Sequence, residues 1–347
     1  MISGRRRGWL AGLQRSLLRA GTFPYASVVA VRNWLFDRRL RKTHSVSIPV
    51  ISVGNITAGG TGKTPLVSWL AQRLAAEDIR VTLISRGYGS SEDRPNDEAL
   101  ELSQKLPGVP HLQNPNRIQA ARQAVDELDS QVIVLDDGFQ HRRIGRDLDL
   151  VLVDATNPFG YGHLLPRGTL REPVAALRRA DMIALTRVDL VEERCLAELE
   201  KQLEQHAPGV PRFHIVYRPE NLINVSQDEK AISDLAGKSV AAFCGVGNPP
   251  AFRQTLEQCG CRVVDFRAFA DHHPYGPNDI KSLNGWLQHL HEIDAVICTH
   301  KDLVKIPLAQ LNQIPLWALT VQPELTSGQA ALEDRLQKLV TRVPRGA

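Results

Sequence analysis

A glycine-rich segment between a predicted strand and a predicted helix constrains the fold of this chain more than any other feature. Residues 47–54 form a short apolar run typical of a buried strand, and residues 64–77 carry apolar side chains at helical spacing. The segment between them reads Thr-Ala-Gly-Gly-Thr-Gly-Lys-Thr, which follows the Walker A pattern except that Thr57 replaces its first glycine. The alternative is a turn that only closes a strand–helix corner, and the Gly-Lys-Thr register argues against it.

Such a segment suits the phosphates of a nucleotide. Small residues let successive backbone N–H groups surround a phosphate at the start of a helix, where the helix dipole also favours negative charge. Lys63 is expected to reach the outer phosphates, and Thr64 is expected to hold Mg²⁺. The predicted binding residues for ATP are Thr57, Ala58, Gly59, Gly60, Thr61, Gly62, Lys63 and Thr64.

Further apolar runs predict a parallel sheet behind this loop. The candidate strands are residues 80–86, 131–135, 148–154 and 181–186. Strands that alternate with helices form parallel sheets whose ligands bind at the C-terminal edge of the strands. Asp136 and Asp137 come directly after one candidate strand, where a carboxylate of the Walker B type would hold the metal ion. The sequence does not distinguish between the two acids.

A second, smaller α/β domain is predicted after the polar stretch at residues 224–230. Residues 238–264 read as strand, turn, helix and strand. A dinucleotide fingerprint is excluded there because its third glycine would fall on Pro250. The predicted organisation is a basic arm at residues 1–43, a P-loop domain at residues 44–225, and a smaller domain at residues 226–347 that closes the cleft over the substrate.

The N-terminal arm is strongly basic. Residues 1–43 hold ten Arg or Lys and a single acid, Asp37, so their net charge is +9 while the other 304 residues carry −5. A nucleic-acid binder would spread its positive charge over a folded face, so this class is disfavoured. The five cysteines are an odd number without a Cys-x-x-Cys pair, which argues against a disulfide scaffold or a zinc site and favours a reducing compartment.

Membrane-surface association is the preferred interpretation of the arm. Charged residues interrupt its apolar run too early for a signal peptide, and its longest uncharged stretch, residues 20–31, has 12 residues against roughly 20 needed to span a bilayer. Apolar residues at helical spacing, with cations off that stripe, predict a pair of interfacial amphipathic helices on an anionic surface. The alternative is a helix packed on the core with a solvated basic rim.

Beyond these patterns, the chain resembles the tetraacyldisaccharide 4'-kinases. The resemblance runs from the arm to about residue 320, nearly the whole chain, and Asp-Asp-Gly-Phe-Gln-His is its most specific string. The stretches that carry it are Ser52–Asn55, Ser85–Gly89, Asp136–His141, Leu165–Gly168, Leu170–Pro173, Asp271–His273 and Thr299–Lys305.

The resemblance implies a kinase that phosphorylates an acylated disaccharide 1-phosphate, a lipid A precursor, on the cytoplasmic face of the Gram-negative inner membrane. ATP and Mg²⁺ would be its cofactors. The matching positions imply that Asp97 acts on the sugar hydroxyl together with a histidine, His273 as first choice and His272 as second. Asn96 and Ala99 stand where the family's Gly-Asp-Glu-Pro stretch has Gly and Pro, and His300 stands where the family usually has Glu. The candidate substrate residues are Arg86, Gln140, His141, Arg167, Arg171 and Glu172.

Two other classes of P-loop protein are alternatives to a kinase of this family. A regulatory or partitioning ATPase would release no small-molecule product, but its signature lysine is replaced by Ala58 here. A metal-delivery GTPase would carry a His- or Cys-rich tract, which the sequence lacks.

Overall fold

The computed structural model describes residues 8–87 and 97–343, which form two compact units. Unit 1 comprises residues 8–87, 108–216 and 325–343, and unit 2 comprises residues 97–107 and 217–324. These units differ from the predicted domain ranges in that residues 97–107 and 217–225 belong to unit 2 and residues 325–343 return to unit 1. Residues 1–7 of the predicted arm lie outside the described residues, as do Tyr88 and Gly89 of one quoted stretch.

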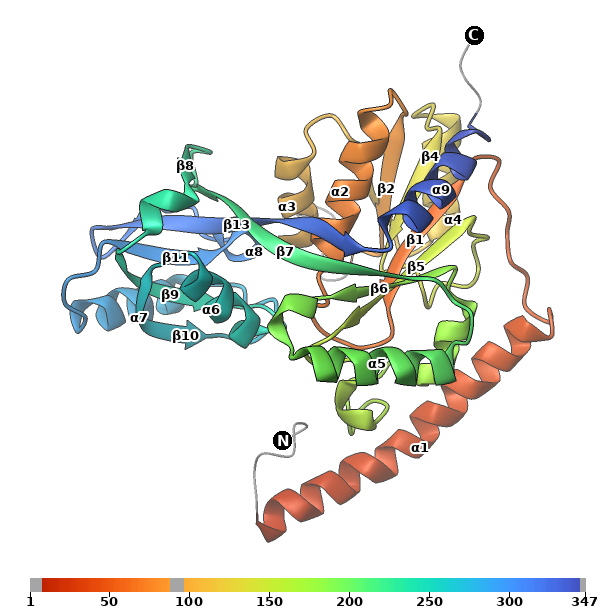
Figure 1. The fold of residues 1–347 in the computed structure, drawn as a ribbon, viewed down its shortest axis with the longest axis horizontal. Helices are drawn as coiled ribbons and strands as arrows, with labels where there is room; N and C mark the ends of the chain where they lie inside the picture. Colours follow the sequence, from red (N-terminus) through yellow and green to blue (C-terminus); the bar gives the residue numbers. More distant parts are fainter. Residues whose placement is uncertain (1–7, 88–96, 344–347) are drawn as a thin grey trace. The chain divides into compact units, whose positions relative to one another are not determined.

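Unit 1 is built on a parallel sheet (Figure 1). Its strand order is β7-β6-β5-β1-β4-β2-β3, and every printed pairing between these strands is parallel. The chain leaves β1 toward β4, β2 and β3 on one side and later fills β5 and β6 on the other, so β1 lies where the strand order reverses. The strands are β1 (Val50–Asn55), β2 (Val81–Ser85), β3 (His111–Gln113), β4 (Val132–Asp136), β5 (Leu148–Asp154), β6 (Met182–Thr186) and β7 (Arg212–Ile223).

The core of unit 1 lies on both faces of this sheet. All residues of β1, β4, β5 and β6 are buried, as expected for parallel strands that are covered by helices. Helix α4 packs three alanines against Ile133 and Leu135 of β4, whereas α5 packs Leu199 and Leu203 against β5 and β6. The helices of unit 1 are α1 (Trp9–Asp37), α2 (Lys63–Ala75), α4 (Arg117–Asp126), α5 (Glu193–His206) and α9 (Gln329–Val340), with the 3₁₀ turns η1 (Gly160–Gly162), η2 (Val174–Arg179) and η3 (Val188–Leu190).

Helix α1 is one continuous helix of 29 residues, so the predicted pair of helices is wrong. Pro24 lies inside it and removes one backbone hydrogen-bond donor. Contacts on both sides of this proline hold the helix on unit 1: Thr22 Oγ1 lies 3.4 Å from Leu164 O, and Tyr25 Oη donates to Arg171 O at 2.9 Å. Of the helices in residues 8–87 and 97–343, none is both long and apolar enough to cross a membrane.

Unit 2 is a smaller α/β unit in which β9 pairs in parallel with both β10 and β11, and β11 pairs in parallel with β13. The predicted strand-helix-strand at residues 238–264 is confirmed as β9, α6 and β10. Asn248 caps α6 because its side chain accepts from Ala251 N, and Pro249 follows at the first helical position. Strands β7 and β13 have residues in both units.

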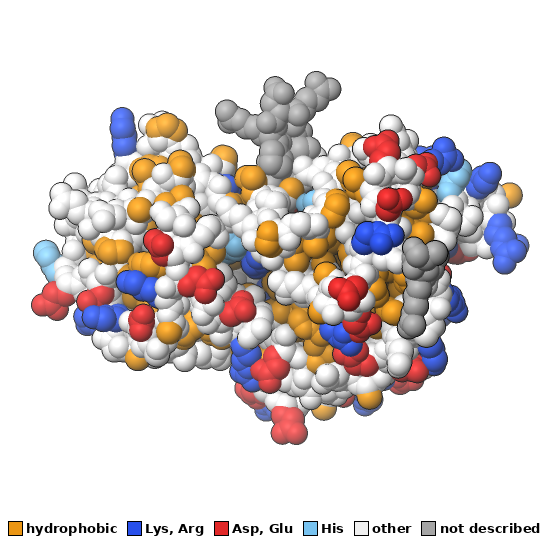
Figure 2. Space-filling model, turned by 90° about the horizontal axis from the view of Figure 1, so that it is seen from above, with side chains coloured by type: hydrophobic (Ala, Val, Ile, Leu, Met, Phe, Trp, Pro, Cys, Tyr) orange, Lys and Arg blue, Asp and Glu red, His pale blue; other side chains and the backbone are white. Residues whose placement is uncertain are grey.

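The remaining elements all have residues in unit 2. On the face drawn in Figure 2, acidic and basic side chains are interspersed with apolar ones. The elements are α3 (Asp97–Lys105), β8 (Glu229–Ala231), η4 (Ile232–Leu235), β9 (Ser239–Cys244), α6 (Pro249–Gln258), β10 (Arg262–Ala268), α7 (Pro277–Gln288), β11 (Ala295–Thr299), α8 (His300–Leu303), β12 (Gln310–Leu311) and β13 (Ile314–Ser327).

Candidate functional site

The glycine-rich loop connects the C-terminal end of β1 to the first turn of α2. Gly59 and Gly62 have φ angles of 117° and 91°, which side-chain-bearing residues rarely adopt. Gly62 precedes the first helical residue, Lys63, so α2 begins one residue earlier than predicted. Backbone N–H groups at the start of α2 have no partner within the helix, which is the geometry that binds a phosphate.

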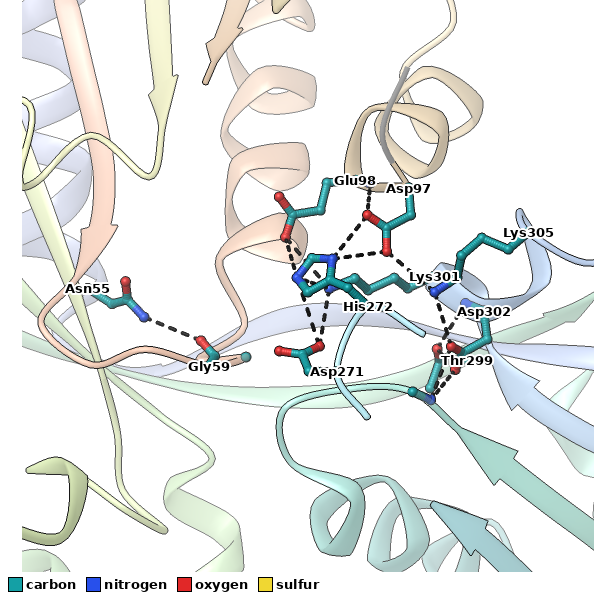
Figure 3. A network of polar contacts seen from close by, with 12 residues as sticks. Asn55, Gly59, Asp97, Glu98, Asp271, His272, Thr299, Lys301, Asp302 and Lys305 are labelled. Carbon is teal, nitrogen blue, oxygen red and sulfur yellow. Dashed lines mark hydrogen bonds and ion pairs between the residues drawn. The ribbon is translucent and has the colours of Figure 1, made fainter. Parts of the chain in front are cut away.

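Asn55 holds the inside of this loop together. Its side chain is fully buried, and its Nδ2 lies 3.1 Å from Thr61 Oγ1 while its Oδ1 accepts from Lys63 Nζ at 3.4 Å. The side chain points toward the backbone oxygen of Gly59 in Figure 3. Asn55 therefore fixes both the loop and its lysine, a role that the sequence reading did not assign.

Backbone pairing replaces the first glycine of the Walker pattern. Thr57 is buried and forms an antiparallel bridge with Leu170, and Ala58 N donates to Thr169 O at 2.6 Å. At the far end of the loop, Thr186 Oγ1 donates to Thr61 O at 3.0 Å. The entry to the loop is thus a short extended segment held against residues 169–171, which explains why a threonine fits there.

Asp137 lies beside the loop and pairs with two cations. Its Oδ1 is 2.6 Å from Arg171 Nη1 and 3.6 Å from Lys63 Nζ. Burial raises the pKa of the Asp137 carboxyl, but the charges of Lys63 and Arg171 outweigh burial and hold this pKa well below its usual range. Asp137 is therefore a carboxylate at neutral pH.

Arg117 supports the turn that carries this acid, and the sequence reading missed it. Arg117 is buried at the start of α4, and its guanidinium donates to the backbone oxygens of Asp136 and Asp137 at 3.1 and 3.2 Å. Gly138 follows and packs closely on Ser52. A Cβ atom added to Gly138 would lie 2.3 Å from Ser52 Oγ. The Asp-Asp-Gly turn is thus locked on both sides.

The residues predicted to hold Mg²⁺ have a suitable donor set. The hydroxyl of Thr64 and the carboxylates of Asp136 and Asp137 are hard oxygen donors of the kind that Mg²⁺ prefers. Thr64 is in the first turn of α2, next to the lysine that contacts Asp137. Asp136 is the last residue of β4 and is buried.

The other predicted substrate residues occupy different environments. Gln140 Nε2 donates to Asn55 O at 2.8 Å, so Gln140 supports the phosphate loop. Burial and nearby arginines lower the pKa of His141 to about 4, so its ring is neutral at pH 7. Arg86 is exposed after β2, and Arg167 lies in the loop beside His163, whose pKa its charge helps to lower.

Glu172, one of the candidate substrate residues, is paired within unit 1. Its side chain is fully buried and accepts from Arg32 at 3.0 Å, from Asn33 at 2.8 Å and from Arg179 at 2.9 Å. Because two arginines and an amide already satisfy it, Glu172 fastens α1 to unit 1.

A second cluster of polar side chains lies in unit 2 and contains Asp97. Asp97 is the first residue of α3, and its two carboxylate oxygens each lie 3.1 Å from His272 Nδ1. Lys305 Nζ approaches the same carboxylate at 3.4 Å. Figure 3 shows Asp97, His272 and Lys305 directed toward one another. The structure therefore brings together a carboxylate and an imidazole that the sequence separates by 175 positions.

The histidine beside Asp97 is His272, not the first choice His273. His272 has a φ of 61°, a left-handed conformation that turns the two neighbouring side chains in different directions. His273 instead pairs with Asp279 at 3.1 Å and stacks on Phe269 with ring centroids 4.8 Å apart. The sequence does not reveal this difference between His272 and His273, because the difference depends on the φ angle of His272.

The charges around the pair keep Asp97 ionised. Burial raises the pKa of Asp97, but the hydrogen bond from His272 and the charges of Lys301 and Lys305 hold it well below its usual range. Lys301 Nζ is 3.0 Å from His272 Nε2 and donates to it when the ring is neutral. The proton of the neutral ring then sits on Nδ1 and is donated to Asp97.

The sequence pattern predicted no role for the two lysines, Lys301 and Lys305. Lys301 is in α8, and Lys305 lies two residues beyond the end of that helix. The two lysines are four positions apart and therefore on one side of a helical turn. Asp302, which is fully buried, lies 3.6 Å from Lys305. His300, at the unusual position of this stretch, is buried and its Nε2 contacts Gln104 at 2.8 Å, with its pKa lowered by burial to about 4.

Comparisons with known proteins identify the family to which the chain is similar. A model of the family described as tetraacyldisaccharide-1-P 4'-kinase matches residues 14–341. Two proteins named tetraacyldisaccharide 4'-kinase are among the relatives. The one from Anaeromyxobacter sp. (strain K) is 36% identical over 364 residues, which cover 98% of this chain and 94% of the relative. The one from Halothermothrix orenii is 38% identical over 309 residues, which cover 81% of this chain and 80% of the relative.

A solved structure extends the similarity to three dimensions. The crystal structure of LpxK from Aquifex aeolicus in complex with ATP aligns with a TM-score of 0.71 and 29% identity, covering 94% of this chain and 99% of that chain. The similarity therefore includes both units and not the phosphate loop alone.

Proposed function

Since the chain belongs to the tetraacyldisaccharide 4'-kinase family, we propose that it transfers the γ-phosphate of ATP to the 4'-hydroxyl of a tetraacyldisaccharide 1-phosphate. The observation that carries this proposal is the match of residues 14–341 to that family. The chemistry of the described side chains supports it, because a phosphate-binding loop and an ionised Asp–His pair belong to the same chain. This is the phosphorylation of a lipid A precursor.

The nucleotide is assigned to unit 1. Residues 57–64 bind the phosphates of ATP through backbone N–H groups and through Lys63, and Arg171 adds a second cation that contacts the same oxygen of Asp137. Thr64 and one of Asp136 and Asp137 hold Mg²⁺, which neutralises charge on the phosphates when bound. Arg86, Gln140, His141 and Arg167 remain candidates for contacts with substrate phosphates.

Asp97 is proposed as the acceptor of the proton from the sugar hydroxyl. As the oxygen of the 4'-hydroxyl bonds to the γ-phosphorus, the bond between that phosphorus and the leaving oxygen of ADP breaks, and the hydroxyl proton passes to Asp97. His272 orients the carboxylate through Nδ1, and Lys301 fixes the ring through Nε2. The low pKa of Asp97 means that the carboxylate is ready to accept a hydrogen bond at any physiological pH.

The direct test of this function is a transfer assay with labelled ATP and tetraacyldisaccharide 1-phosphate in detergent micelles. We expect the wild-type chain to place label on the lipid, at the 4' position of the product. Hydrolysis of ATP without labelled lipid would contradict the proposal and favour a regulatory or partitioning ATPase instead.

The membrane surface at which this reaction takes place is proposed to be the cytoplasmic face of the inner membrane, with α1 lying in the lipid interface. Large apolar side chains on α1 are exposed: Trp9, Leu10, Leu13, Leu17, Phe23, Val28, Val31 and Trp34. Basic side chains at residues 38–42 follow the helix directly. An exposed apolar face beside cations is what binds a helix to an anionic bilayer surface, and it lets the acyl chains of the substrate stay in the membrane.

Replacing Leu10, Leu13 and Leu17 by Ser is expected to reduce co-sedimentation with vesicles that contain anionic phospholipid at least severalfold. Each leucine that leaves the lipid forfeits roughly 1.5–3 kcal/mol of burial. The matched control replaces three exposed aliphatic residues elsewhere, Val225, Val264 and Leu308, by Ser. Equal binding by the leucine variant and the control would contradict the proposed role of α1.

A further inference from the structure

Helix α1 contacts Arg171, which bonds to Ile56 just before the phosphate loop, and the neighbouring Glu172. Tyr25 Oη donates to the backbone oxygen of Arg171 at 2.9 Å, and Arg32 and Asn33 donate to the side chain of Glu172 at 3.0 and 2.8 Å. We call Tyr25, Arg32 and Asn33 the α1 anchor. All of its contacts are within unit 1 and lie on the buried side of the helix, opposite the exposed apolar residues.

The α1 anchor is stable because the side chain of Glu172 is excluded from solvent. The carboxylate is fully buried, and an unpaired carboxylate there would be costly, so Arg32, Asn33 and Arg179 are held to it. Arg179 also lies over the ring of Phe139, 4.5 Å from its centroid. Phe139 belongs to the Asp136–His141 turn, so Glu172 connects the α1 anchor to that turn through Arg179.

The segment that the α1 anchor contacts is also hydrogen-bonded to the phosphate loop. Arg171 N donates to Ile56 O at 2.7 Å, and the neighbouring Thr169 O accepts from Ala58 N at 2.6 Å. The side chain of Arg171 continues to Asp137 at 2.6 Å. Residues 169–172 are thus bonded to α1 on one side and to the phosphate loop and its acid on the other.

We propose that the α1 anchor positions Arg171 for the nucleotide, so that α1 is part of the framework of the ATP site and not only a membrane-binding segment. Tyr25, Arg32 and Asn33 are positioning residues that act through Arg171 and Glu172. The inference rests on the proposed function only in taking ATP as the nucleotide.

The test is the dissociation constant of ATP with Mg²⁺, measured by calorimetry on the full chain without lipid. Tyr25→Phe removes a single hydroxyl, so the variant is expected to fold. Losing one hydrogen bond that orients Arg171 is expected to weaken ATP binding by about two- to tenfold. In a background of Arg171→Ala, the same Tyr25→Phe change is expected to have no further effect, because the group that it positions is gone.

Ser27→Ala is the matched control, since Ser27 is exposed on α1 and its hydroxyl donates to Phe23 O one turn earlier. It is expected to bind ATP like the wild type. The proposal is overturned if Tyr25→Phe binds ATP as the wild type does, or if it weakens binding equally with and without Arg171, which would indicate a general loss of stability. Asn33→Ala is measured in the same way and is expected to share the defect. A wild-type chain that binds ATP but does not label the lipid would instead refute the proposed function.

Discussion

Lys63→Ala is expected to lower the rate of phosphate transfer from ATP to tetraacyldisaccharide 1-phosphate by about 10²–10³-fold, the usual cost of removing a group that stabilises charge in the transition state. Lys63 starts α2 and is held between Asn55 and Asp137, so its ammonium is already placed beside the loop that receives the phosphates. Initial rates with labelled ATP in micelles measure this directly. Dissociation constants for ATP show how much of the loss is ground-state binding.

Arg73→Ala serves as the control for Lys63→Ala. Arg73 is a cation on the same helix, but it lies almost three turns further on, where it pairs with Glu77 and with Glu333 of α9. Surface pairs of this kind contribute about 0–1 kcal/mol to stability, so the transfer rate is expected to stay near that of the wild type. Comparable losses in both variants would mean that α2 as a whole had been disturbed and would remove the support for a specific role of Lys63.

Asp97→Asn is expected to lower kcat by about 10²–10⁴-fold, the range that a positioned acid or base contributes, while the dissociation constant of ATP stays close to the wild-type value. Asparagine keeps the shape of the side chain but cannot accept the hydroxyl proton. Because Asp97 lies in unit 2 and the phosphate loop in unit 1, the variant separates the two roles. A rate near that of the wild type would exclude Asp97 as the proton acceptor, and lost ATP binding would point to a role in holding the metal.

The two adjacent histidines provide an internal comparison for this prediction. His272→Ala removes the ring that contacts both oxygens of Asp97 and is expected to lower kcat strongly, whereas His273→Ala removes a ring that contacts Asp279 and Phe269 and is expected to change kcat far less. If His273→Ala were the more severe of the two, the pairing of Asp97 with His272 would have no catalytic meaning.

The fold class was predictable because its signals are local. The apolar runs at residues 148–154 and 181–186 became β5 and β6 almost to the residue, and the glycine-rich loop lies at the C-terminal edge of the sheet as expected. A continuous apolar run bounded by polar residues specifies a buried parallel strand without reference to the rest of the chain. The same holds for the strand-helix-strand of unit 2.

The details of the site depended on contacts between distant residues. No local pattern indicates that Glu172 is closed off by Arg32 of α1, 140 positions away. The choice between His272 and His273 was decided by a left-handed backbone angle, and the continuity of α1 through Pro24 was decided by contacts with residues 164–171. Lys301 and Lys305 were visible as a pair of cations four positions apart, but only tertiary packing brings Lys305 to Asp97 and Lys301 to His272.

The position of Asp97 in the chain has an evolutionary consequence. The carboxylate is encoded in the first half of the sequence, between β2 and β3 of the nucleotide-binding sheet, whereas His272 and the two lysines are encoded in the second half. A recombination event that exchanged residues 217–324 as a block would carry the imidazole and the lysines without their carboxylate. Modular shuffling of this unit between proteins would therefore break the pair, and the two parts of the gene are expected to be inherited together.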